Sequence, residues 1–86
     1  MSDLLARAIV DALRHREWAV RRDDWDVVVV RHPRTARTVA TIAIHDGRPT
    51  LDSVDDVYRP GIERTIATAI ERYRRERQRR RQRGAA

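Results

Sequence analysis

The 86-residue sequence has no cysteine, no lysine and no phenylalanine, and only three glycines and three prolines. Without cysteine it can form neither a disulfide nor a thiolate-ligated metal site. Without phenylalanine, its core must be filled by leucine, isoleucine, valine and alanine, with Trp18 and Trp25 as the only large anchors. A chain this short forms one small domain with a thin core, to which dimerisation would add stability.

Long apolar runs are also missing. The longest covers residues 27–30, far below the roughly 20 residues that span a bilayer. Asp3, Arg7 and Asp11 interrupt the apolar pattern of the first helix, so this segment does not read as a signal peptide. We expect a soluble cytoplasmic protein that makes no membrane contact.

The residue patterns of catalysis and of cofactor binding are absent as well. The two serines, Ser2 and Ser53, resemble helix caps, and three glycines form no phosphate-binding loop. Three scattered histidines provide no converging set of metal ligands. Asp26 resembles the first carboxylate of a restriction-nuclease-type core, but residues 43–45 lack the Glu and Lys of that pattern. We expect no enzyme activity, no cofactor and no metal.

Positive charge is concentrated at the C-terminus. Residues 1–70 hold eleven arginines and eleven acids, whereas residues 71–86 hold eight arginines and two acids. The whole net charge of +6 therefore belongs to this last segment. Guanidinium groups bind phosphate in a bidentate manner, although a GC-rich genome would also explain the exclusive use of arginine.

Apolar spacing predicts the secondary structure. A helix is expected over residues 3–16, with an N-cap at Ser2, followed by strands near residues 18–21, 25–31 and 38–45. Residues 22–24 are expected to form a turn, residues 31–37 a polar loop, and residues 46–47 a hairpin turn. Residues 49–51 would add a short edge strand, and residues 53–56 resemble a capping box.

A second helix is predicted from Pro60, with an apolar stripe that ends at Tyr73. The pairs Glu71–Arg75 and Glu76–Arg80 favour its continuation to about Gln82. We therefore divide the chain into a domain of residues 1–73 and an arginine-rich helical extension of residues 74–86. The expected fold is a two-layer α+β domain: a helix, an antiparallel meander of three or four strands, and a long C-terminal helix.

The leading functional hypothesis is a small nucleic-acid-binding protein that contacts the phosphate backbone of DNA or RNA. Segment 72–83 resembles in kind the arginine-rich motif peptides that bind RNA, and this resemblance implies phosphate contacts. The candidate binding residues are Arg72, Arg74, Arg75, Arg77, Arg79, Arg80, Arg81 and Arg83 of the extension, with Arg31, Arg34 and Arg37 of the loop as a second contact point.

The element order is similar to that of double-stranded-RNA-binding domains. Those domains carry a Gly-Pro-x-His loop and a Lys-rich start of the second helix, whereas residues 22–24 and 60–64 of this chain have neither. The alternative function is a protein–protein adaptor or inhibitor, of the kind found in phage and mobile elements. It would use the open sheet face or the acidic segment 52–56, and a homodimer is one form it could take. An exposed apolar sheet face would favour this alternative, and tail arginines converging with Arg34 and Arg37 would favour nucleic acid.

Overall fold

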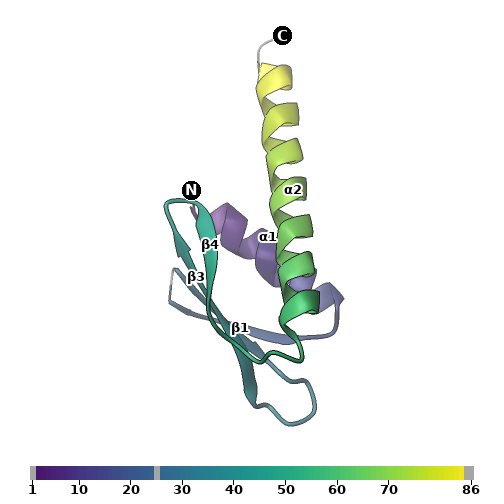
Figure 1. Ribbon diagram of the computed structural model, residues 1–86. Coiled ribbons are helices and arrows are strands. Elements are labelled where there is room, and N and C mark those ends of the chain that lie inside the picture. Colours follow the sequence, from purple (N-terminus) through teal and green to yellow (C-terminus); the bar gives the residue numbers. More distant parts are fainter. Residues whose placement is uncertain (1, 25, 85–86) are drawn as a thin grey trace.

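The computed structural model describes residues 2–24 and 26–84, and the side chains of residues 4–24 and 26–81. Helix α1 (Ser2–His15) is followed by strands β1 (Ala19–Asp24), β2 (Val27–Arg31), β3 (Thr38–His45) and β4 (Arg48–Val54), and then by helix α2 (Arg59–Gly84). Figure 1 shows a twisted sheet beside α1 and a long α2 that extends well beyond it. The predicted α+β fold is confirmed.

The four strands form an antiparallel meander in the order β1-β2-β3-β4. The edge strand β4 is longer than predicted, since it includes Arg48 and runs to Val54. Pro49 pairs with Ile44 on this edge, where a missing backbone donor is tolerated. A register shift between Thr41 and Ile42 bulges β4 and lets it continue.

The predicted turn at residues 22–24 is wrong, because these residues belong to β1. Arg22 lies opposite Val28 and Asp24 opposite Val27, with a register shift between them. Charged side chains are well tolerated on an edge strand, where they also discourage pairing with other chains. Here the hydrogen-bonded ladder to β2 outweighs the local turn preference of aspartate.

The core consists of aliphatic side chains, as predicted. Both helices lie on the same side of the sheet: α1 packs against β1, β2 and β3, and α2 packs chiefly against α1. The fully buried side chains with the largest volumes are Ile9, Leu13, Val28, Val30, Ile42, Ile44 and Ile62. Trp18 is half-buried at the edge of this core, and Trp25 lies outside the described residues.

The segment before α2 is capped by Asp55 and not by Ser53, which lies in β4 opposite Thr41. The Asp55 carboxylate accepts a hydrogen bond from the backbone N–H of Val57 at 3.2 Å. Its backbone carbonyl accepts two more, from the N–H groups of Tyr58 and Arg59. The predicted capping box is therefore displaced by two residues, with Pro60 in the first turn of α2 as expected.

Meander topology decides which segments share an end of the molecule. The β2–β3 loop and the start of α2 lie at one end, and the β3–β4 turn lies at the other (Figure 1). Helix α2 runs back along the domain and leaves it at the end of the β3–β4 turn. Within the described chain, neither helix is long and apolar enough to cross a membrane.

Candidate nucleic-acid interface

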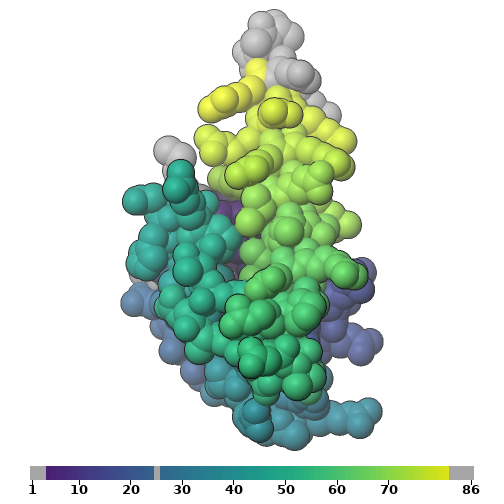
Figure 2. All heavy atoms as spheres, in the orientation of Figure 1, coloured from purple at the N-terminus to yellow at the C-terminus, as the bar shows by residue number. Residues whose placement is uncertain are grey.

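The arginine-rich extension is a direct continuation of α2. The helix has 26 residues, which corresponds to about 39 Å at 1.5 Å per residue. Tyr73 is the last of its residues to pack against the core. The following eleven positions to Gly84 therefore carry the helix roughly 16 Å further. In Figure 2 this part stands clear of the domain, with its side chains spread outwards.

Local interactions explain why the chain stays helical beyond the core. Arg75 Nη2 donates to Glu71 Oε1 at 3.0 Å, as the i,i+4 spacing predicts. The Arg77 guanidinium lies over the Tyr73 ring, 5.9 Å from its centroid. The second predicted pair does not form, since Glu76 and Arg80 make no ion pair although both side chains are described. Cationic groups near the C-terminal end of a helix also interact favourably with its dipole.

The arginines of α2 point in all directions around the helix axis. At 100° per residue, Arg74, Arg77 and Arg79 alone cover more than half of the circumference. All seven described arginines from Arg72 to Arg81 are exposed. No apolar stripe continues past Tyr73, so this segment offers no seam for a coiled coil.

Most of the arginines of α2 whose side chains the structure describes lack an anionic partner. From Arg72 to Arg81, Arg75 alone forms an ion pair among the described side chains, while Arg72, Arg74, Arg79, Arg80 and Arg81 form none. Closely spaced cations on one helix repel each other, and a polyanion relieves that repulsion. The side chain of the remaining candidate, Arg83, lies outside the described residues.

The loop arginines are not part of this surface. Arg34 and Arg37 lie on the β2–β3 loop, at the opposite end of the domain from the extension. Arg37 Nη2 donates to Asp55 Oδ2 at 2.8 Å, so its charge is largely compensated. Arg31 ends β2, and its Nε is buried without a hydrogen-bond partner in the described part of the chain. The convergence of the loop arginines with the extension, which would have favoured nucleic-acid binding, does not occur.

His32 has a structural role in the same loop. Its Nδ1 accepts long hydrogen bonds from the backbone N–H groups of Arg34 and Thr35, at 3.2 and 3.4 Å. Its ring also contacts Trp18 and Tyr58, whose own centroids lie 5.1 Å apart in a T-shaped arrangement. Trp18 is therefore engaged in an aromatic cluster far from the extension.

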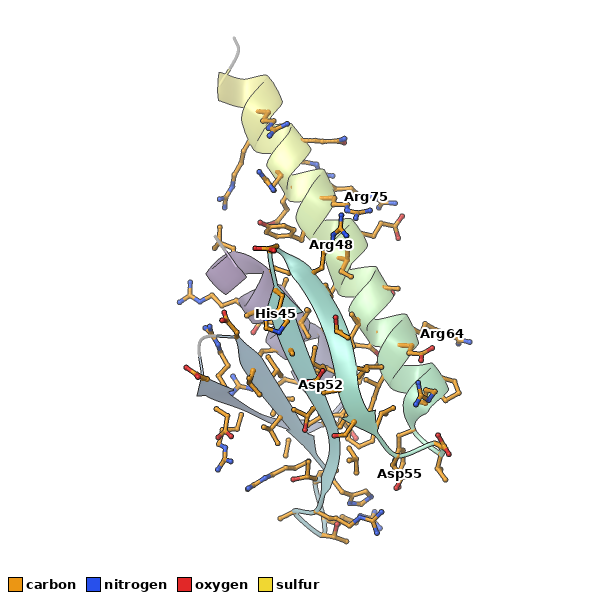
Figure 3. All side chains as sticks on the ribbon, turned by 60° about the vertical axis from the view of Figure 1, so that its left-hand side comes forward. His45, Arg48, Asp52, Asp55, Arg64 and Arg75 are labelled. Atoms are coloured by element: carbon orange, nitrogen blue, oxygen red, sulfur yellow. The ribbon has the colours of Figure 1, made fainter. Side chains whose placement is uncertain are left out.

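The structure adds a basic residue that the sequence analysis missed. Arg48 follows the β3–β4 turn, at the end of the domain where α2 leaves it (Figure 3). It lines a groove together with Arg74 and Arg77 of the extension. Connections in a meander alternate between the two ends of the sheet, so the element order alone could have placed this turn, and not the β2–β3 loop, next to the extension.

The candidate ligands and carboxylates of the sequence do not gather in the part of the chain that the structure describes. Within the described residues no three histidine or acidic side chains converge on a point that could hold a metal ion. Asp26, the candidate carboxylate of a nuclease core, is exposed at the β1–β2 connection, and its backbone carbonyl accepts from Ile44 N at 2.8 Å.

Comparison with known proteins identified no relative: no protein-family model, no curated protein and no solved structure matches this chain.

Proposed function

We propose that this protein binds nucleic acid, and that the arginines of the α2 extension contact its phosphate backbone. The observation that supports the proposal is the projecting helix itself, which presents unpaired guanidinium groups around its axis. An α-helix with its side chains is about 10–12 Å across, and the major groove of duplex DNA is about 12 Å wide. The extension therefore has a suitable size to lie in or along a groove.

The contacts would position the protein without reading much sequence. Arginines spread around a whole helix meet phosphates on both walls of a groove, whereas base readout needs a few side chains fixed on one face. We therefore expect binding with weak sequence preference and strong dependence on salt. About six phosphate contacts on duplex DNA would give a slope near −5 for log K against log salt.

Among the described residues, the outer face of the sheet carries no large exposed apolar side chain that would favour a protein–protein role. The outer face carries the cross-strand neighbours Arg21, Val29, Thr41 and Ser53. Val29 is only 7% exposed, although neither helix covers this face. The large apolar side chains that are exposed in the described chain, Leu4 and Val57, lie outside the strands.

The proposal can be tested on the full chain with a matched pair of triple variants. One replaces Arg79, Arg80 and Arg81 of the extension by glutamine, and the other replaces Arg16, Arg34 and Arg64 of the domain. Both remove the same charge from exposed positions. Fluorescence anisotropy with labelled 20-mers of duplex DNA, single-stranded DNA and RNA would measure affinity at several salt concentrations.

For duplex DNA, the extension variant should lose about 2.7 units of the salt slope, and the domain variant should change it little. Truncation after Tyr73 should abolish binding at physiological salt. Equal affinities and slopes for the two triple variants, or no binding of the intact chain to any of the three probes, would overturn the proposed function.

A further inference from the structure

A groove opens where α2 leaves the domain. One wall is formed by α2 at Tyr73, Arg74 and Arg77, and the other by the β3–β4 turn with Arg48. Leu5 and Ile44 lie almost fully buried beneath the groove, and the partly buried Ile70 also lines it. Its volume is about 740 Å³, which is large enough for a nucleotide unit.

The turn geometry fixes one wall of this groove. Asp46 and Gly47 both have positive φ, at 51° and 73°, as in the two-residue turns that match the twist of a hairpin. His45 therefore pairs directly with Arg48 across the turn. In this register Arg48 is the first residue of β4 and lines the groove (Figure 3).

The helix fixes the opposite wall. Arg74 and Arg77 are three residues apart, so they lie on neighbouring turns of the same helix face. The Tyr73 ring under the Arg77 guanidinium restrains that side chain near the groove. Three guanidinium groups from two elements far apart in the sequence thus line one depression.

The charges in the groove indicate what kind of anion it suits. Asp26 and Asp46 line it too, yet neither forms an ion pair with Arg48, Arg74 or Arg77 in the described part of the chain. The guanidinium groups thus remain available to a ligand, while the two carboxylates weaken the attraction for a small free anion. A chain of phosphates that is already held by the extension would overcome this, because its local concentration at the groove is high.

We propose that the groove holds a phosphodiester segment of the nucleic acid that the extension binds. Arg48 contacts a phosphate from the hairpin side, and Arg74 and Arg77 contact it or its neighbour from the helix side. The partly exposed side chains of Tyr73 and Ile70 offer apolar surface to the sugar or base between these phosphates. This inference rests on the proposed function, and it adds a second element that fixes the direction in which the nucleic acid crosses the domain.

The test compares Arg48→Ala with Arg34→Ala, since both remove one exposed arginine: Arg48 from the start of β4 and Arg34 from the β2–β3 loop. Affinity is measured with the same three 20-mer probes. On the probe that the intact chain binds, Arg48→Ala should weaken binding about three- to tenfold, and on duplex DNA the salt slope should fall by about 1. Arg34→Ala should bind like the unmodified chain.

An independent measurement uses the unmodified protein, so it does not depend on the folding of a variant. In a ¹H–¹⁵N NMR titration with the bound 20-mer, the Gly47 amide should shift together with the amides of residues 74–77. The amides of residues 34–37 should stay in place.

The possible outcomes separate the two proposals. If the extension triple variant loses affinity but Arg48→Ala binds normally, or if the Gly47 amide does not shift, the groove assignment is overturned and the proposed function stands. If the intact chain binds none of the probes, both proposals are overturned. Loss of affinity in Arg48→Ala together with a shifted Gly47 amide supports the groove.

Discussion

Arg77 lies over the ring of Tyr73, with its guanidinium carbon 5.9 Å from the ring centroid. Tyr73 is also the last residue of α2 that packs against the core. The contact therefore joins the part of the helix that the core stabilises to the part that has no core contact. Helical turns that pack against nothing are only marginally stable in water. The Arg77–Tyr73 contact and the Glu71–Arg75 pair therefore help to keep the extension helical when no polyanion is bound.

The first prediction concerns the order of the extension. Replacing Tyr73 by leucine keeps an apolar side chain against the core but removes the aromatic face under Arg77. A cation–π contact at an exposed site contributes about 0.5–1 kcal/mol, so the hydrogen-exchange protection of amides 77–80 should fall roughly two- to fivefold. Tyr73→Phe keeps the ring and is the control. Equal protection in the two variants would show that the contact does not stabilise the extension.

The second prediction concerns Asp55, whose side chain is 24% exposed and joins two segments. Its carboxylate accepts from Arg37 Nη2 at 2.8 Å and from the backbone N–H of Val57 at 3.2 Å. Asp55→Ala removes a capping interaction and an ion pair together, and should lower the free energy of unfolding by about 1–2 kcal/mol.

Urea denaturation measures this loss, and Asp56→Ala provides the matched control. The Asp56 side chain is 95% exposed and lies 3.6 Å from Arg59 Nε, so its removal should have almost no effect. Arg37→Ala should cost less than Asp55→Ala, because it leaves the capping bond intact. An equal loss for Arg37→Ala and Asp55→Ala would mean that the ion pair, and not the cap, holds this junction.

The sequence is sufficient to predict most of the fold, since alternation and helical periodicity carry the information. Strand β3 has the predicted bounds, and the apolar stripe from Ile62 to Tyr73 is the face of α2 that packs on the core. The failures occur where a local preference competes with a distant partner. Residues 22–24 favour a turn locally, but the exposed edge of β2 provides a ladder that they join.

In the candidate site, too, features that are local in sequence could be predicted, and features that depend on distant partners could not. The extension could be predicted, because its charge and its helix-forming pairs are local in sequence. The groove could not be predicted from local patterns, since Arg48 and Arg77 are separated by 28 residues and come together only through the tight β3–β4 turn and the return of α2. Conversely, the sequence suggests the arginines of the β2–β3 loop as a second phosphate-contacting point. The meander places this loop at the end of the domain opposite the extension.

The last prediction concerns the two glycines at opposite ends of this arrangement. Gly47 has a φ of +73°, whereas Gly61 lies in the first turn of α2, and a Cβ atom would meet no other atom within 4 Å at either position. Steric clashes with neighbours are therefore absent in both cases, and backbone conformation alone decides the outcome. Gly47→Ala should lower the free energy of unfolding by about 1–2 kcal/mol, because an L-residue is disfavoured in the left-handed region.

Gly61→Ala should instead raise the free energy of unfolding by about 0.5–1 kcal/mol, because alanine restricts the unfolded chain and favours the helix. Urea denaturation of the two variants should thus give changes of opposite sign. The Gly47 variant should also weaken nucleic-acid binding beyond its effect on stability, since a distorted turn moves Arg48 away from α2. Normal affinity in a folded Gly47→Ala protein would indicate that the turn geometry is not needed to place Arg48 in the groove.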